Sequence, residues 1–196
     1  MKWVIALGLL AFVQVTAGYR NLLVNPGANG GTDGWSVSQA DAGYEACEPR
    51  NNCFVVQRFG GFVQDFKLPD SNVGQFALAV GFARAERTAP EAGITDRPNL
   101  HLIFSNQDRT RILYSSNIVS LQTAIHSGSS PDWQKIWAAY EIPAGAAWGN
   151  LRMSLGSRKG VEHDGSRGWF DDVGVFVVPT EAEARQIVSN YTRSPK

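Results

Sequence analysis

Asn-Leu-Leu-Val-Asn-Pro-Gly at residues 21–27 and Gly-Trp-Phe-Asp-Asp-Val at residues 168–173 are the two stretches that decide the fold. The first reads as a short apolar strand that ends in a turn, because Pro26 fixes φ and Gly27 tolerates positive φ. The second is a strongly apolar strand near the other end of the chain. We interpret them as the first and last strands of one sandwich, lying side by side.

Most of the sequence between these stretches alternates with a period of two, which is typical of half-buried antiparallel strands. The clearest strand candidates are residues 53–58, 61–68, 76–84, 100–104, 109–115, 136–142, 151–155 and 167–178. About nine or ten such segments suit an all-β fold, a two-sheet antiparallel jelly-roll β-sandwich. On the strand at 76–84, one face is small and could pack closely against another sheet.

Segments without this alternation are expected to be surface loops. They are residues 27–34, 41–52, 84–98, 122–132 and 158–167. Only the tail changes period, because Thr180 and Glu183 form a capping box that begins a short C-terminal helix ending near Tyr191. We therefore expect the sandwich over residues 18–179 and the helix and tail over residues 180–196.

The first 17 residues have the order of a secretory signal peptide: Lys2, an apolar stretch, and the small-residue pattern Val-Thr-Ala at residues 15–17. The stretch is too short for a stable membrane span. Cleavage after it would leave a secreted, extracellular domain. The alternative, an N-terminal strand or helix of the fold, is less favoured because residues 9–12 show no polar face.

Charge narrows the choice of partners. Lys and Arg total 18 and Asp and Glu total 18, so loss of Lys2 with the signal peptide would leave a net charge of about −1. We expect no nucleic-acid partner, since there is no basic field, and no membrane partner, since there is no second apolar span.

Cys47 and Cys53 are the only cysteines. In an oxidising compartment two cysteines that bracket a polar loop favour a disulfide, and their spacing is poor for zinc. Asn190 begins a glycosylation sequon, Asn-Tyr-Thr, which has meaning if the chain is secreted.

Catalytic motifs are weak, and we expect no catalytic residue and no enzyme. His101, His126 and His163 lie in different segments, without a second ligand or base at useful spacing. Neither a Gly-x-Ser-x-Gly elbow nor a phosphate-binding Gly-x-x-x-x-Gly-Lys loop occurs. An enzyme of the β-sandwich lyase or hydrolase type would require His101, Arg152 and an acidic residue within hydrogen-bond reach.

The pair Asp171 and Asp172 lies within the apolar last strand. Adjacent strand residues point to opposite faces, so one of these carboxylates at most would be buried. A buried carboxylate needs a partner or a cation. Arg152 and Arg167 are the candidate partners, and backbone amides are the alternative.

Aromatic residues are numerous: six Trp, ten Phe and five Tyr. Those expected in loops or at strand ends, where they could stack on a sugar ring, are Trp35, Tyr44, Phe59, Trp133 and Trp148. The alternative for each is a plug that closes one end of the sandwich. Trp137 and Trp169 lie inside strand candidates and are expected in the core.

In order and spacing, residues 21–27, 54–66, 132–136, 145–153 and 168–170 resemble the strands of the F-box-associated (FBA) domain. This domain belongs to the galactose-binding-like β-sandwich superfamily, and the resemblance covers most of residues 20–178. It implies a galactose-binding-like jelly roll that binds the chitobiose core of N-linked glycans through loops at one end.

The resemblance also implies a loop site. Phe59 matches an aromatic that contacts the sugar, and Gly165-Ser166-Arg167 stands where the family has Tyr-Trp-Lys. Only the basic residue is retained, so high-mannose specificity does not carry over. We expect the ligand-binding residues to be Phe59, Tyr44, Arg167 and Trp35.

Carbohydrate-binding modules of this architecture often hold a structural calcium beside the Asn-Pro-Gly turn, which implies Asn25, Asn29 and Asp172 as oxygen ligands here. Asn29 stands where the family pattern has glutamate. No other cofactor is expected.

Together these observations predict a secreted, non-catalytic recognition module that binds carbohydrate or glycoprotein glycans. Because a signal peptide is expected at the N-terminus, we expect no F-box before the domain. A cytosolic glycoprotein-recognition subunit of a ubiquitin ligase is therefore an alternative only if the N-terminus does not target the chain. A second alternative is an extracellular structural or protein-interaction domain that uses a sheet face, which a broad exposed apolar face would favour.

Overall fold

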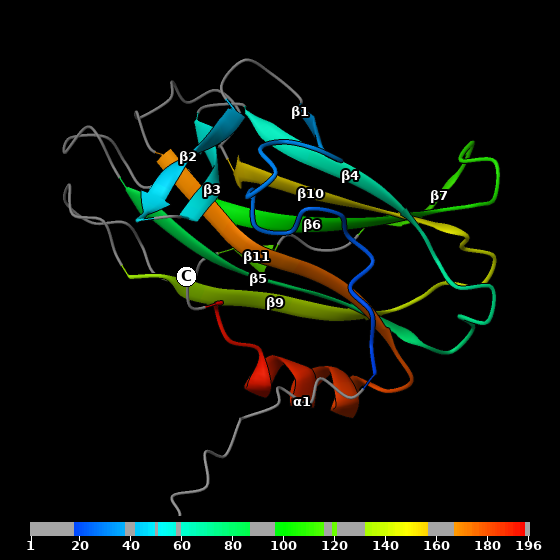
Figure 1. The fold of residues 1–196 in the computed structure, drawn as a ribbon. Coiled ribbons are helices and arrows are strands. Elements are labelled where there is room, and N and C mark those ends of the chain that lie inside the picture. The colour runs from blue at the N-terminus through cyan, green and yellow to red at the C-terminus, as the bar shows by residue number, and fades with distance from the viewer. Residues whose placement is uncertain are drawn as a thin grey trace, which may run out of the picture.

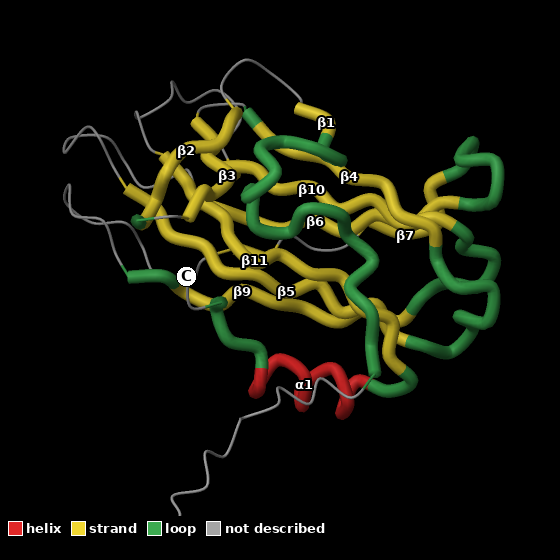
Figure 2. The backbone as a smooth tube through the Cα atoms, viewed as in Figure 1, coloured by secondary structure: helices red, strands yellow, loops and turns green. Residues whose placement is uncertain are grey.

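Two antiparallel sheets stack face to face, and one helix lies on the outer side of the second sheet (Figures 1 and 2). The computed structural model describes residues 18–37, 42–49, 51–57, 60–86, 97–115, 119–120, 132–156 and 167–194. The predicted all-β sandwich is therefore confirmed. The predicted signal peptide at residues 1–17, Phe59, His126 and His163 lie outside the described residues.

The strands divide between sheet A and sheet B, and every pairing among the described residues is antiparallel. Sheet A has the order β1 (Ser36–Val37), β4 (Gly61–Lys67), β10 (Trp148–Gly156), β6 (Arg97–Ser105) and β7 (Ile112–Ser115), with β8 (Val119–Ser120) also paired to β6. Sheet B has the order β2 (Ala42–Glu48), β3 (Asn51–Gln57), β11 (Arg167–Val178), β5 (Phe76–Glu86) and β9 (Gln134–Glu141).

The two ends of the sandwich meet as the sequence predicts, but the prediction of a strand at residues 21–27 is wrong, because this segment is a bent loop that lies along β11. The backbone amide of Leu22 donates to the carbonyl of Val175 at 2.9 Å, and that of Val173 donates to the carbonyl of Pro26 at 2.9 Å. The side chain of Asn21 extends this contact: its Nδ2 donates to the Val173 carbonyl and its Oδ1 accepts from the Val175 amide. The N-terminal segment is thus held along β11 by both backbone and side chain.

A β-bulge interrupts β11 where this contact is made. Asp171 pairs with Phe82 and Gly174 pairs with Val80, so three steps on β11 face two steps on β5. The bulge contains Asp172, whose φ is 45°. One added residue lets Phe170 and Val173 both face the core. The bulge also interrupts the strict alternation of inward and outward side chains. The prediction that Asp171 and Asp172 point to opposite faces is based on that alternation.

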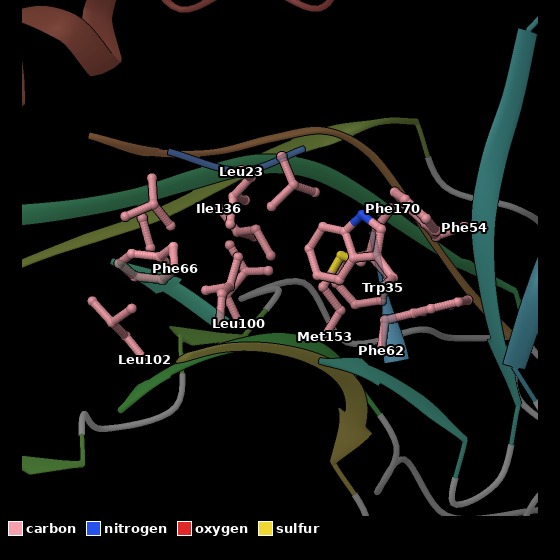
Figure 3. Packing of buried hydrophobic residues seen from close by; sticks show 14 of the residues in the cluster. Leu23, Trp35, Phe54, Phe62, Phe66, Leu100, Leu102, Ile136, Met153 and Phe170 are labelled. Carbon is pink, nitrogen blue, oxygen red and sulfur yellow. The ribbon is translucent and has the colours of Figure 1, made fainter. Parts of the chain in front are cut away.

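The core fills the space between the sheets (Figure 3). Trp35 packs edge-on against Phe54 and Phe62, with ring centroids 5.2 and 6.4 Å apart. Met153 of sheet A and Phe170 of sheet B belong to the same cluster. Aromatic side chains from the loop and from both sheets therefore close this end of the sandwich.

The two faces of β5 are both covered. Its small residues, among them Ala77, Ala79 and Ala83, face the core and allow close approach of sheet A. Its large residues Leu78 and Val80 face outward and pack with the helix α1 (Glu181–Asn190). This strand therefore lacks the broad exposed apolar face that would favour a protein-interaction domain.

Helix α1 begins as predicted. Thr180 accepts a hydrogen bond from the amide of Glu183 at 3.2 Å, and its hydroxyl donates to the Glu183 carboxylate at 3.0 Å. Its buried residues Ala184, Ile187 and Val188 contact the outer face of sheet B, so tertiary packing adds to the cap in fixing this short helix.

One predicted loop is wrong. Residues 41–52 contain β2, which pairs with β3 and lies at the edge of sheet B among the described strands. Its sequence, Ala-Gly-Tyr-Glu-Ala-Cys-Glu, lacks an apolar alternation because an edge strand buries little of either face. Trp148 lies at a strand end, as predicted, because it is the first residue of β10.

Among the described residues, no helix has the length and apolar character needed to cross a membrane.

Candidate functional site

The predicted loop site is not assembled by the described residues. Tyr44 pairs with Phe54, which faces the core, whereas Arg167 pairs with Gln57 on the outer side of sheet B. The two side chains therefore lie on opposite faces of one sheet. Tyr44 is half exposed and packs against the turn at Gly31, where φ is 66° and an added Cβ would lie 3.1 Å from the ring. The role of Phe59 stays a prediction.

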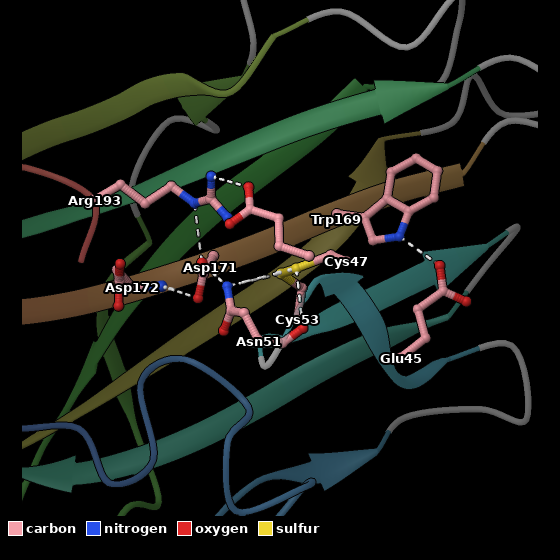
Figure 4. Close-up of a disulfide and its surroundings, with 9 residues drawn as sticks. Glu45, Cys47, Asn51, Cys53, Trp169, Asp171, Asp172 and Arg193 are labelled. Carbon is pink, nitrogen blue, oxygen red and sulfur yellow. Dashed lines mark hydrogen bonds and ion pairs between the residues drawn. A yellow bond between two sulfur atoms is a disulfide. The ribbon is translucent and has the colours of Figure 1, made fainter. Parts of the chain in front are cut away.

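Arg167 is bound within the protein. Its Nη2 lies 2.6 Å from Glu45 Oε2, and Glu45 Oε1 accepts a 2.6 Å hydrogen bond from the Trp169 indole (Figure 4). The guanidinium also lies 5.1 Å from the Trp169 ring centroid. Arg167 thus fixes the β2 edge to β11, which leaves little of its charge for a ligand.

Trp35 belongs to the core rather than to a loop surface. Only 7% of it is exposed, and its indole donates to the carbonyl of Asn25 at 3.0 Å. The alternative interpretation of this aromatic, a plug at one end of the sandwich, is the correct one, and we remove Trp35 from the candidate site.

The predicted calcium ligands lie near one another but are bonded elsewhere. Val173 binds Pro26, which brings the bulge beside the turn. Asn25 Oδ1 accepts from the amide of Gly30 and its Nδ2 donates to the Gly31 carbonyl, while Asp172 accepts from the amide and hydroxyl of Ser194. Asn29 is exposed. Asn25 Oδ1 and both carboxylate oxygens of Asp172 are thus engaged within the protein, so the donor set does not fit calcium and we derive no role from one.

The buried carboxylate of the pair is Asp171, and its partner is neither Arg152 nor Arg167. Asp171 is fully buried and binds Arg193 Nε at 3.0 Å and Asn51 Nδ2 at 2.9 Å (Figure 4). Arg193 also binds Glu48 at 2.5 Å, and this hydrogen bond lowers the pKa of the Glu48 carboxyl. Arg193 follows the C-terminal helix in the sequence. The alternation of residues along a strand does not predict a contact with so distant a segment.

The predicted disulfide between Cys47 and Cys53 is present beside this ion pair. The two sulfur atoms and a carboxylate oxygen of Asp171 lie within 4.8 Å of one another. Because the sulfurs are bonded to each other, they are not the thiolates that a metal site would require. The disulfide joins β2 to β3 at the sheet edge.

A ladder of alternating guanidinium and indole groups covers the outer face of sheet B beside the disulfide. We call it the Arg–Trp ladder, and its members are Arg193, Trp133, Arg84, Trp169 and Arg167. Each guanidinium lies 4.1–5.2 Å from an indole centroid, the range in which cation–π attraction operates. Trp169, expected in the main core, is instead buried in this separate outer cluster.

The outer face of sheet A has a different character. A polar row crosses its strands, and its members are Asp65 on β4, Asn150 and Arg152 on β10, His101 on β6 and Ser115 on β7. The side chains on this face are half-buried or exposed at these positions. Alternate residues of β10, such as Leu151 and Met153, face the core, which is why the polar row points outward.

Hydrogen bonds connect the polar row across the strands. Asn150 Nδ2 donates to Asp65 Oδ1 at 2.5 Å, and Arg152 Nε donates to Asn150 Oδ1 at 3.2 Å. His101 Nε2 and Ser115 Oγ lie 2.6 Å apart. A bonded network of this kind holds planar amide, carboxylate and guanidinium groups in fixed orientations on an open surface.

Trp148 lies at one end of the polar row, two residues before Asn150 on the same side of β10. Its indole donates to the Gln107 carbonyl at 3.2 Å, and the Arg109 guanidinium lies 3.6 Å from its ring centroid. Arg109 also binds Asp65 at 2.8 Å. A half-exposed aromatic thus stands beside fixed polar groups, the combination that binds a sugar ring through its apolar face and its hydroxyls.

The polar row does not form the constellation that would indicate an enzyme. His101 lies opposite Arg152 in the β6–β10 pairing. Among the described residues, however, Arg152 reaches the Asp65 carboxylate only through Asn150. Within the described ranges, no acid is therefore found that joins His101 and Arg152 at one point where a reacting atom could bind.

Asn190, the predicted glycosylation site, is the last residue of α1 and is exposed. The following Tyr191 turns inward and donates to the Asp172 carbonyl at 2.8 Å. Glycosylation itself stays a prediction.

Comparisons of the chain with known proteins identify its fold. No protein-family model matches the chain, and no curated protein matches it. Among solved structures it is similar to the CBM22-2 xylan-binding domain from Paenibacillus barcinonensis Xyn10C, with 18% identity, a TM-score of 0.53, and 80% of this chain and 99% of that domain covered. It is also similar to a family 16 carbohydrate-binding module, with 16% identity, a TM-score of 0.53, and 79% and 99% covered.

A third similar structure is the enzymatically active domain of bacteriophage CBA120 tailspike protein 4, with 13% identity and a TM-score of 0.57. The match covers 81% of this chain and 21% of that chain. At these identities the likeness shows the fold alone: a two-sheet β-sandwich of the kind that carbohydrate-binding modules adopt.

Proposed function

We propose that this protein is a non-catalytic carbohydrate-binding module whose site is the outer face of sheet A. The observation that carries the proposal is the polar row with Trp148 at its end, exposed on a sandwich that resembles modules described as carbohydrate-binding. The four strands of the row span about 14 Å, three strand spacings of roughly 4.8 Å, which leaves room for a short oligosaccharide.

The residues of the proposed site would contact a sugar in different ways. Asn150 and Asp65 offer a planar amide and a carboxylate to neighbouring sugar hydroxyls, which both donate and accept. Trp148 is half-buried with Arg109 stacked on one side of its ring, and it offers only the uncovered part of that ring to the C–H face of a sugar. The network orients these groups before a ligand arrives, so less conformational entropy is lost on binding. Affinity would still be modest, since the face is open rather than a deep pocket.

Secretion is part of the proposal. The signal-peptide pattern of residues 1–17 supports it, and so does the Cys47–Cys53 disulfide, because disulfides persist in oxidising compartments. Glycoprotein glycans of the kind implied by the FBA resemblance are one class of ligand to include in the test, but the row itself requires only hydroxyl-bearing sugars.

A glycan array followed by calorimetric titration of the best ligand tests the site. Asn150→Ala removes the amide that connects Asp65 and Arg152, and we expect affinity to fall at least tenfold, about 1.4 kcal/mol. The matched control is Gln186→Ala, an exposed amide on the helix of sheet B, which should bind as the parent does. Equal affinity in all three proteins would place the ligand elsewhere.

A further inference from the structure

The positive and negative side chains of the polar row and its neighbours are not all paired with one another. Asp65 is the carboxylate of the row, and both of its oxygens are engaged, Oδ1 by Asn150 and Oδ2 by Arg109. Arg109 is therefore neutralised by Asp65. The neighbouring cation Lys67 lies 3.7 Å from Asp70. Among the residues whose side chains the structure describes, these pairs leave the charge of Arg152 to account for.

Arg152 has no acidic partner among the residues that the structure describes. Its Nε donates to the neutral amide oxygen of Asn150 at 3.2 Å. On β4 it lies opposite Val63, and on β6 opposite His101. The side chain is exposed. In the described part of the chain, its two terminal nitrogens have no hydrogen-bond partner, so their donors are available to a ligand.

The contact with Asn150 also decides how the guanidinium is held. Binding through Nε fixes one edge of the planar group and presents the Nη edge, which matches a carboxylate with two parallel hydrogen bonds. The imidazole of His101 lies opposite Arg152 in the β6–β10 pairing, with its Nε2 2.6 Å from Ser115 Oγ. A neutral sugar would leave this cation uncompensated, whereas a planar anion would pair with it.

Building on the proposed function, we infer that the preferred glycan is acidic and that Arg152 binds a uronic acid carboxylate. The neutral groups around Trp148 and Asn150 would hold adjoining sugar hydroxyls, and Arg152 would decide between charged and uncharged sugars. A charge-assisted bidentate contact at an exposed site predicts about 10- to 100-fold tighter binding of the acidic form.

Matched polymers test this inference on the full chain. The probes are polygalacturonic acid and glucuronoxylan, each compared with the same polymer after its carboxylates are reduced to primary alcohols, and dextran sulfate as a non-planar anion. Calorimetric titration should give the 10- to 100-fold preference for the carboxylated form of at least one polymer. In Arg152→Gln the preference should shrink to about threefold or less, with weak binding of the reduced polymer retained.

Arg185→Gln is the control, because it removes a cation from the helix on the opposite sheet and should leave the preference intact. Equal binding of acidic and reduced polymers, a preference that survives Arg152→Gln, or binding of dextran sulfate alone would overturn the acidic-sugar inference while glycan binding stands. Binding of neutral glycans alone on the array would also overturn the acidic-sugar inference and leave the proposed glycan binding standing. Absence of binding to any glycan would overturn both proposals. A urea denaturation midpoint for Arg152→Gln that equals that of the parent confirms that the fold is kept.

Discussion

The outer faces of the two sheets contain similar residues in different roles. On sheet B, Arg193 and Arg167 are bound by carboxylates and stacked on tryptophans, and helix α1 covers the rest of the face. On sheet A, Arg152 and Asn150 form a shallow network that stays open to solvent. An arginine or tryptophan is therefore no guide to binding by itself; what matters is whether the fold has already satisfied it.

The difference has a thermodynamic counterpart. Substitutions on the outer face of sheet B should reduce stability and leave binding unchanged, whereas substitutions in the polar row should do the reverse. The following tests use this contrast, beginning with the largest expected effect.

Asp171→Ala should cause the largest loss of stability. It leaves Arg193 partly buried with Glu48 as its remaining ion partner, and breaking a buried ion pair by removing one member costs about 3–5 kcal/mol. The matched variant Asp65→Ala removes an exposed, ion-paired carboxylate from sheet A and should cost about 1 kcal/mol or less. Urea denaturation followed by tryptophan fluorescence measures both. Similar losses in the two variants would contradict the contrast.

Removal of the disulfide should have the next largest effect. Replacing Cys47 and Cys53 together by alanine frees a short loop between β2 and β3, and the loop-entropy relation predicts a loss of about 2 kcal/mol. Glycan affinity should be unchanged because the polar row lies on the other sheet. A tenfold fall in affinity, with circular dichroism unchanged, would show that the two faces are coupled.

The buried phenol of Tyr191 should make the free energy of unfolding depend on pH in the alkaline range. Burial, followed by the nearby Asp172 and Asp171 charges, raises the pKa of this phenol. The unfolded chain would ionise near its ordinary value of 10.0 while the folded chain stays protonated, so the free energy of unfolding should fall as pH rises above that value. In Tyr191→Phe this fall should be smaller, at a cost near neutral pH of about 1 kcal/mol for the lost hydrogen bond. Parallel pH profiles for the two proteins would contradict this assignment.

Thr180→Ala should have the smallest effect. It removes the cap of α1 and should lower the free energy of unfolding by about 1 kcal/mol. Thr180→Ser retains the hydroxyl and should be nearly neutral. Thermal denaturation resolves the two, and an equal loss in both variants would show that the hydroxyl does not cap the helix.

The sequence predicted most of the long strands, the helix and the meeting of the two ends, because period-two alternation and turn chemistry are local. It placed a strand at residues 21–27, where the structure has a loop. It did not predict β2, since an edge strand needs little apolar pattern. It also missed Arg193 as the partner of Asp171, because that contact joins strand to tail through the tertiary fold.

The candidate site was harder to find for the same reason. Asn150 and Arg152 are visible in the sequence as the polar side of β10, yet nothing local places Asp65 and His101 on the neighbouring strands. Arg167 and Trp35, which the resemblance and the loop positions favoured, are used by the ion pair with Glu45 and by the core. Strand order, which sequence alternation leaves open, decides which polar side chains share a face.

Amide chemical shifts recorded by NMR during titration with the best array glycan test the central claim most directly. Perturbations concentrated on β4, β10 and β6, around Asn150 and Trp148, are the predicted result. Perturbations concentrated on sheet B, or at the loop end that contains Phe59, would contradict it.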